Sequence, residues 1–528
     1  MENEPIQACL DLLEQARHLS LEDERRRLLE QAASDLVRDG RRRRRAARRA
    51  VRAATDAELL ADTVTRAPDR IMDTALSADT RHRAGLSVHE YVQGHSGPGG
   101  VTRRTPGRVP DGDEPPRLLN RPQRCYVCKN HYRLVHHFYG QLCPGCADEN
   151  LARRTARTDL TGRRALLTGG RVKIGFHVAL MLLRDGAELT VTTRFPQDAA
   201  NRFAAAPGAA DWWHRLRIAA LDLRDPRQVL ALTDHLLDEA APLDILVNNA
   251  AQTLHRSPRA YRALAAAEAA AVATAQRATA PEIWTAPGFA VPGSHTAALP
   301  LTAELASRAR VSGALAGVRR GAEGALAPTT EPTTEPTTEP TTEPAPTPAP
   351  ASDLQERTDE AGLLQETGSS NSWTLRLGQV EPAELLEVQL VNAVAPFLLA
   401  DRLLPLLEAS PHARRYLINV SAVEGQFDVR NKTSGHPHTN MAKAALNMLT
   451  RTSAADLAAR GIHTCSVDTG WVTDEKPLPA RERHAATGWR PPLDVIDGAA
   501  RIYHPIVQGQ AGSPIHGVLL KDYRDVAW

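Results

Sequence analysis

From about Asp159 onward, the chain alternates short apolar segments with helix-like segments, and this alternation restricts its fold most strongly. The stretch RRALLTGGRVKIGFHVALMLLRDGAELTVTTR contains an apolar segment, a glycine turn, a helical segment and a second apolar segment. Further apolar segments follow in LRIAALDL and LDILVNNA. Strands separated by helices run parallel and are joined by crossover connections. The pattern therefore predicts an α/β fold with a doubly wound, Rossmann-type parallel sheet.

A long interruption divides this predicted sheet. The alternation stops at Gln252 and resumes near Gln379, and the segment between contains an alanine-rich helical stretch and four tandem TTEP units. A Pro/Thr/Ala-rich sequence buries too little apolar surface to offset its ordering entropy. We therefore predict one sheet domain, formed by residues 156–251 and 379–528, and a low-complexity, largely disordered insertion over 252–378.

The N-terminal region has a different composition. Residues 1–117 are rich in Arg, Ala, Leu, Asp and Glu, which predicts helices followed by a linker, and they include the basic run GRRRRRAARRAVR from Gly40 to Arg52. The whole chain has 64 Lys+Arg against 62 Asp+Glu in 528 residues, so acidic residues elsewhere balance this run. A solvated helix, an acidic protein partner or intramolecular pairing is favoured for the run, and nucleic acid stays open as an alternative partner.

The cellular location of the protein is predicted from two features that its sequence does not show, a membrane span and a secretory signal. No apolar stretch reaches the roughly 18 residues of a membrane span, and the start MENEPIQACLDLLEQ does not resemble a secretory signal. We expect a cytoplasmic protein of two or more domains without disulfides. The helix predicted in VNAVAPFLLADRLLPLLE offers a surface for homo-oligomer formation.

Four cysteines form two Cys-x-x-Cys pairs separated by 14 residues. Two such turns can present four thiolates tetrahedrally, which is typical of structural zinc. We predict a zinc-ribbon-like module over residues 118–155, which staples a small domain or binds a protein partner. Its predicted metal ligands are Cys125, Cys128, Cys143 and Cys146.

The glycine turn and several later segments resemble the short-chain dehydrogenase/reductase family. TGGRVKIG is similar to the family's T-G-x-x-x-G-x-G turn, with Lys173 at the middle glycine. NNAA resembles the family's N-N-A-G, and DTGWVTDE resembles its P-G-x-V-x-T segment over the nicotinamide. The Lys173 side chain could block a dinucleotide, or its ammonium could reach a phosphate. The resemblance implies a cofactor site at Thr168, Gly169, Gly170, Arg171, Lys173, Ile174, Gly175, Arg194, Asp222, Asn249, Ala250, Thr469, Gly470 and Val472.

The residue at the end of the second predicted strand indicates which dinucleotide is bound. NAD-selective members of the family place a carboxylate there, whereas this strand ends in VTTR with Arg194. A guanidinium suits the 2′-phosphate of NADP by bidentate hydrogen bonding, and Arg171 in the glycine turn offers a second one. NADP(H) is therefore expected in preference to NAD(H).

The catalytic motif is only partly present. The resemblance places Asn392, Ser421 and Lys443 at the family's asparagine, serine and lysine, but Thr439 stands where the family has its tyrosine. A threonine hydroxyl is too weak an acid for that role, although it could position substrate or relay a proton to Lys443. A histidine beside it, His438 or His436, is an alternative proton donor.

Three functions follow from these motifs. The first is an NADP(H)-dependent oxidoreductase of a carbonyl or alcohol substrate with an atypical proton donor. The second is a sensor or scaffold that binds NADP(H) without turnover. The third is an interaction protein whose zinc ribbon is the working part. Retention of Asn392, Ser421 and Lys443 favours the first.

Overall fold

The computed structural model describes residues 3–66, 116–274, 281–292, 358–429 and 432–528. The contacts divide these residues into two units, one comprising 3–66 with 116–144 and the other the remainder from 145. The TTEP repeats lie outside the described residues.

The first unit combines two helices with a β-hairpin. Asp23 caps the N-terminus of the long second helix by accepting from the backbone N–H of Arg25 at 2.9 Å. The hairpin is joined to that helix through Asp56, which accepts from the backbone N–H of Asn120 at 2.7 Å and of Arg121 at 3.1 Å. The elements are α1 (Asn3–Arg17), α2 (Glu24–Ala61), η1 (Val64–Arg66), β1 (Leu118–Arg124) and β2 (His131–Leu134).

The second unit contains a nine-stranded sheet in the order β11-β10-β9-β8-β6-β3-β4-β5-β7. All neighbouring strands pair in parallel except β10 and β11, which form an antiparallel edge. The strand order reverses at β3, between β6 and β4, which is the switch point where doubly wound sheets bind ligands. The strands are β3 (Arg164–Thr168), β4 (Glu188–Thr193), β5 (Leu216–Ala220), β6 (Ile245–Asn248), β7 (Glu282–Thr285), β8 (Arg415–Ser421), β9 (Ile462–Asp468), β10 (Leu519–Lys521) and β11 (Arg524–Val526).

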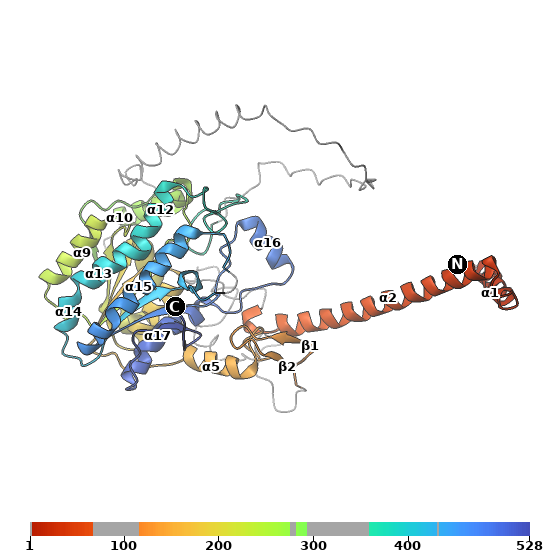
Figure 1. Ribbon diagram of the computed structural model, residues 1–528. Helices are drawn as coiled ribbons and strands as arrows, with labels where there is room; N and C mark the ends of the chain where they lie inside the picture. Colours follow the sequence, from red (N-terminus) through yellow and green to blue (C-terminus); the bar gives the residue numbers. More distant parts are fainter. Residues whose placement is uncertain (1–2, 67–115, 275–280, 293–357, 430–431) are drawn as a thin grey trace, which may run out of the picture. The chain divides into compact units, whose positions relative to one another are not determined.

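Helices cover both faces of this sheet and bury two apolar cores (Figure 1). On one face, α6 (Lys173–Arg184) packs against α17 (Val495–Gln510). On the other face lie α9 (Pro226–Asp238), α13 (Ala395–Arg402) and α15 (Pro437–Ala459). The predicted Rossmann-type α/β fold is confirmed. The remaining helices are α5 (Pro144–Arg154), α7 (Pro196–Ala204), α8 (Ala209–Trp212), η2 (Trp213–Arg215), η3 (Pro258–Tyr261), α10 (Arg262–Thr274), α12 (Pro382–Gln389), η4 (Leu390–Val394), α14 (Leu404–Glu408), η5 (Val423–Gly425) and α16 (Leu478–Ala486).

One helical stretch in the described residues, Pro382–Arg402, has the length and composition of a membrane span. It comprises α12, η4 and α13, and its residues Val388 and Leu399 are buried. Leu399 belongs to the second apolar core, so the apolar character of this stretch serves packing against the sheet.

Described parts of the segment predicted as an insertion over residues 252–378 contribute to the fold. The predicted alanine-rich helix is α10, and β7 pairs with β5 as an edge strand of the sheet, with Arg217 opposite Glu282 and Ala220 opposite Thr285. The helix α5, which carries Cys146, also contacts α17: its Arg154 pairs with Asp494, the N-cap residue of α17, at 2.6 Å.

Candidate active site

The glycine turn after β3 is closely packed against the segment that follows β6. Gly169 has a φ of +72°, and a Cβ on it would lie 3.0 Å from Ala250. A Cβ on Gly175 would lie 2.1 Å from the carbonyl oxygen of Gly169 and 2.5 Å from Nδ2 of Asn249. Asn249 and Ala250 donate their backbone N–H groups to the hydroxyl of Thr168, each at 3.0 Å. The predicted cofactor residues of these two segments are therefore neighbours at the switch point.

Lys173 occupies the position of the missing glycine and keeps a left-handed backbone, with φ at +55°. Its ammonium lies 3.7 Å from the carboxylate of Glu475, the last residue of the predicted nicotinamide segment DTGWVTDE. Burial alone would raise the pKa of Glu475, but the Lys173 charge and a hydrogen bond from Thr473 lower it. The glycine turn and the segment after β9 are thus joined by an ion pair.

The two arginines predicted for the 2′-phosphate have different surroundings. Arg171 is buried and donates to Asp198 at 2.5 Å and to the Ala361 carbonyl at 2.9 Å. Arg194 lies over the ring of Tyr261, 5.3 Å from its centroid, and pairs with no carboxylate among the described residues. Arg194 therefore keeps its hydrogen-bond donors for a ligand.

Asp222, one of the predicted cofactor residues, accepts hydrogen bonds from Arg224. Burial alone would raise the pKa of Asp222, but hydrogen bonds and the charge of Arg224 hold it below its usual range. Arg224 also donates to Glu387 at 3.1 Å, so it links this end of the site to α12.

Asn392 lies in η4, a π-helical turn, and π-turns often occur at functional sites. Its side chain accepts from the backbone N–H of Gln252 at 2.7 Å and donates to the Gln252 carbonyl at 3.1 Å. These two bonds fix the helix against the segment that follows β6.

Ser421 and Thr439 each bury a hydroxyl that has no hydrogen-bond partner within the described part of the chain. Ser421 ends β8, and Thr439 lies in the first turn of α15. Lys443, one helical turn further, donates its ammonium to the carbonyl of Val420 at 2.7 Å. Burial lowers the pKa of Lys443 to about 8, and the Glu424 charge opposes that shift. Buried polar atoms without partners are uncommon, and these two hydroxyls are suited to a ligand.

The two candidate histidines lie in different surroundings. His438 is buried against α12, with Nε2 3.2 Å from Glu384. His436 is the N-cap residue of α15 and stacks on Trp373 of the insertion, with ring centroids 4.1 Å apart. Trp373, Glu424 and Glu475 had no predicted role. Glu475 ends the quoted segment DTGWVTDE and Glu424 follows Ser421 by three residues, whereas no motif pointed to Trp373.

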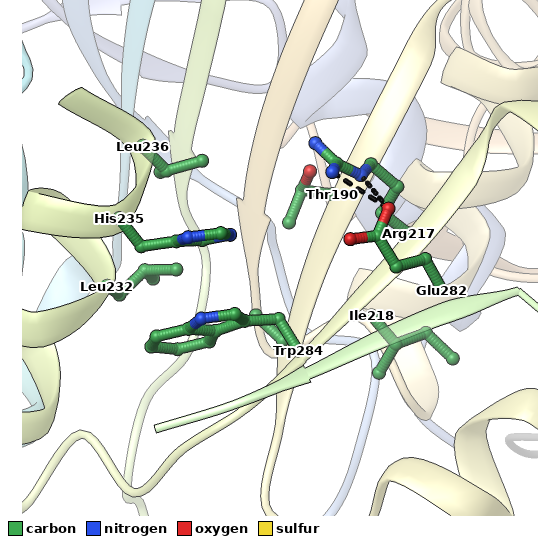
Figure 2. A pocket seen from close by; sticks show the side chains of 9 residues that line it. Thr190, Arg217, Ile218, Leu232, His235, Leu236, Glu282 and Trp284 are labelled. Carbon is green, nitrogen blue, oxygen red and sulfur yellow. Dashed lines mark hydrogen bonds and ion pairs between the residues drawn. The ribbon is translucent and has the colours of Figure 1, made fainter. Parts of the chain in front are cut away.

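A pocket in the same unit lies away from these residues. Figure 2 shows the rings of His235 and Trp284, stacked with centroids 5.0 Å apart, beside Arg217 and Glu282. Arg217 donates to both Glu239 and Glu282, so its charge is paired. Its register on β5 places it near the amino end of the strand, whereas the glycine turn lies at the carboxyl end of β3. This pocket is not part of the candidate site.

The four predicted metal ligands come together. The sulfurs of Cys125, Cys128, Cys143 and Cys146 all lie within 4.8 Å of one another. The Cys128 and Cys143 sulfurs are 3.7 Å apart, and the Cys143 backbone N–H donates to the Cys125 sulfur at 3.3 Å. Such a closed set of four thiolates fits a tetrahedral metal ion. The cluster follows the helical region, so it is not at the N-terminus of the chain.

Relatives of known sequence match different lengths of the chain. An uncharacterized protein of Acanthamoeba polyphaga mimivirus is 29% identical over 402 residues, which are 72% of this chain and 71% of that protein. The C-signal protein of Myxococcus xanthus is 32% identical over 136 residues, which are 26% of this chain and 80% of the relative. A probable oxidoreductase of Streptomyces antibioticus is 44% identical over 95 residues, which are 17% of this chain and only 30% of that protein.

Family models agree with these relatives. The model described as short chain dehydrogenase matches residues 163–282, and the model described as enoyl-(acyl carrier protein) reductase matches residues 354–486. The two matches contain the glycine turn and the segment from Asn392 to Lys443, which the structure brings to the same sheet. The chain belongs to the short-chain dehydrogenase/reductase family.

Proposed function

We propose that the protein is an NADP(H)-dependent oxidoreductase of a carbonyl or alcohol substrate. One observation carries the proposal: the glycine turn at the switch point of the sheet belongs to the same domain as a buried lysine and two buried hydroxyls without partners. The turn has room for a backbone to approach phosphate but none for a side chain at Gly175. This close-packed cradle fits a dinucleotide.

The residues of the site have different roles in binding the cofactor, positioning the helix and binding the substrate. The N-terminus of α6 offers backbone N–H groups and a positive dipole to the pyrophosphate, and Arg194 offers its guanidinium to the 2′-phosphate. Asn392 fixes the active-site helix through its two bonds to Gln252. The Ser421 hydroxyl can donate to a substrate carbonyl oxygen, and charged Lys443 stabilises negative charge that develops nearby. Bound NADPH supplies the hydride.

Calorimetric titration with NADPH and with NADH tests the cofactor. We expect NADPH to bind at least about tenfold more tightly, because Arg194 adds charge-assisted hydrogen bonds to the 2′-phosphate. Arg194→Ala should remove most of that preference while leaving NADH affinity nearly unchanged. Arg451→Ala, at an exposed position on α15, is the matched control. Equal affinity for both dinucleotides in the parent protein would overturn the NADP assignment.

A second candidate function is dinucleotide binding without turnover. Thr439 at the tyrosine position favours it, because no threonine hydroxyl has the acidity needed for proton transfer. NADPH binding combined with no NADPH oxidation across aldehydes, ketones and quinones would favour this function over the first.

We also propose that the cysteine cluster holds a structural zinc ion. Its support is the convergence of four cysteine sulfurs within 4.8 Å of one another, because four thiolates supply all the ligands of a structural zinc site. Purified protein should contain one equivalent of zinc by elemental analysis. Cys143→Ser should lose most of it, whereas Cys9→Ser, at an exposed cysteine outside the cluster, should keep it. Retention of a full equivalent in Cys143→Ser would contradict the site.

A further inference from the structure

The basic run of α2 is exposed to solvent along its whole length. Every residue from 41 to 55 is exposed, and this stretch contains no Asp or Glu. Within the described part of the chain, only Arg43 of the run pairs with a carboxylate, that of Asp39 at 2.6 Å. Intramolecular pairing therefore accounts for one arginine of the run and leaves the charges of the others available. The arginines are Arg41, Arg42, Arg43, Arg44, Arg45, Arg48, Arg49 and Arg52.

The helix gathers the unpaired arginines on one side. The backbone of α2 is helical through the whole run, and successive residues of a helix turn by about 100°. The unpaired arginines therefore fall within an arc of about 160°, whereas Arg43 lies on the other side of the helix. We call this arc the basic face of α2. It consists of Arg41, Arg42, Arg44, Arg45, Arg48, Arg49 and Arg52.

The side of α2 opposite the basic face carries only small side chains. It consists of Ala46, Ala47, Ala50, Ala53 and Ala54, with Arg43 among them. A helix that lies on a membrane inserts large apolar side chains opposite its basic residues. Alanine methyl groups bury too little apolar area for that purpose, so the basic face favours a polyanion in solution over a lipid surface.

The spacing of the charges matches that of duplex DNA. Arg41 and Arg52 lie about 16 Å apart along the helix axis, so the basic face carries one positive charge about every 2.4 Å. Duplex DNA carries one negative charge about every 1.7 Å of its axis. A guanidinium binds phosphate through two parallel hydrogen bonds, which makes arginine well suited to this partner.

The shape of the basic face selects among nucleic acids. The major groove of B-form DNA is about 12 Å wide and admits an α-helix, with phosphates along both of its walls. An arc of about 160° directs arginines to both walls at once. The major groove of duplex RNA is deep and narrow and excludes a helix. Double-stranded DNA is therefore the polyanion that fits the basic face.

The hairpin of the same unit adds positive charge at one end of α2. Residues 116–147 contain no Asp or Glu. Besides the bonds of Asp56, Arg117 joins the hairpin to α2 by donating to the Leu59 carbonyl at 3.1 Å and to Asp62 at 2.7 Å. In Figure 1, α2 extends away from this hairpin. The exposed basic residues of the hairpin are Arg121, Arg124, Lys129 and Arg133.

We propose that the basic face of α2 binds the phosphate backbone of double-stranded DNA, with α2 in the major groove. The proposal does not rest on the oxidoreductase function, because α2 and the glycine turn belong to different units of the chain. It gives the chain a second binding site, for a ligand that is unrelated to the dinucleotide.

Fluorescence anisotropy of a labelled DNA duplex of mixed sequence, titrated with the full-length protein, tests the proposal. Between about 50 and 200 mM salt, the logarithm of the binding constant should fall with the logarithm of the salt concentration with a slope of about −6, because each of the neutralised phosphates contributes about −0.9. A slope shallower than about −2, or no binding at the lowest salt, would overturn the proposal.

A matched pair of variants separates the basic face from the general charge of the unit. Replacing four arginines of the face by Gln should lower DNA affinity at least about 100-fold at about 100 mM salt. Replacing four exposed arginines outside the run by Gln removes the same charge and should change affinity by less than about threefold. Equal losses in both variants would overturn the proposal. The first set is Arg41, Arg45, Arg48 and Arg52, and the control set is Arg17, Arg25, Arg27 and Arg38.

A loss of binding through unfolding is excluded by a further variant. Lysine at the four positions of the first set keeps the charge and should keep most of the affinity. Both four-residue Gln variants should retain the helical circular dichroism of the parent protein. A Lys variant that binds as weakly as the Gln variant, with its helix intact, would overturn a phosphate-binding role for these positions.

Single substitutions test which side of α2 meets the DNA. Arg45→Gln should reduce the magnitude of the salt slope by about one, whereas Arg43→Gln, on the opposite side, should leave it unchanged. Competition then tests the identity of the polyanion. If duplex RNA, phosphatidylserine vesicles or polyglutamate displaces the DNA as effectively per negative charge as unlabelled duplex does, double-stranded DNA is not the preferred partner and the proposal is overturned.

Discussion

The cofactor half and the catalytic half of the site depart from the family pattern in different ways. In the cofactor half, one glycine is replaced by Lys173, yet the backbone keeps its left-handed conformation and the turn keeps its packing. In the catalytic half, Thr439 stands at the tyrosine position, and the neighbouring His438 and His436 contact Glu384 of α12 and Trp373 of the insertion. The close-packed backbone of the glycine turn thus tolerates the Lys173 replacement, whereas the tyrosine position carries a side chain of different acidity.

The largest effect is expected from closing the glycine turn. Gly175→Ala would place a methyl group 2.1 Å from the Gly169 carbonyl oxygen, so the turn must move. We expect NADPH affinity, measured by calorimetry, to fall by at least about 100-fold, because the backbone can no longer approach the pyrophosphate. Gly368→Ala, at an exposed glycine with more space, should bind as the parent does. If Gly175→Ala binds NADPH normally, the glycine turn tolerates substitution as well as the tyrosine position does.

A smaller effect is expected from the pH dependence of stability that Lys443 introduces. Its pKa is lowered from 10.5 to about 8 in the folded protein, so unfolding takes up a proton between these values. Stability conferred by neutral Lys443 is absent below pH 8 and grows as the pH rises toward 10.5. Relative to Lys443→Met, the parent should gain up to about 3 kcal/mol in unfolding free energy over this interval. Denaturant titrations of both proteins at several pH values measure this gain. If the unfolding free energies of the parent and of Lys443→Met change in parallel with pH, burial does not lower the pKa of Lys443.

The smallest effect is expected from removing the charge of Lys173. Lys173→Met deletes the ion pair with Glu475 and any contact of the ammonium with phosphate, so NADPH affinity should fall by about three- to tenfold. Glu475→Gln frees Lys173 and should leave NADPH affinity equal or higher. If Lys173→Met instead binds NADPH more tightly, the lysine side chain obstructs the cofactor. The glycine turn would then keep its backbone conformation while its side chain hinders binding.

Local sequence patterns were sufficient to predict most of the sheet. The alternation from Asp159 onward predicted the strands β3, β4, β5 and β6 separated by helices, because each element has its own hydrophobic period. The cysteine spacing likewise predicted the cluster of sulfurs.

Contacts between distant segments could not be predicted in this way. The strand β7 has four residues and no alternating pattern of its own, and only pairing with β5 identifies it. The stacking of Trp373 on His436 joins residues 63 positions apart. The pairing of Arg171 with Asp198 is similar, since the arginine alone suggested a phosphate ligand. These features depend on tertiary packing, which the local conformational preferences of the residues do not determine.

The pairing of β6 with β8 has a consequence for how the chain folds during synthesis. Asn248 and Asn419 are partners in the centre of the sheet although 171 residues separate them. Loop-closure entropy grows only logarithmically, so the long connection has a small equilibrium cost of about 0.6 kcal/mol per doubling. The kinetic cost is larger, because a ribosome adding about 5–20 residues per second needs roughly ten to thirty seconds to deliver β8. During that time one edge of β6 is an unpaired template, which exposes the nascent chain to incorrect strand pairing.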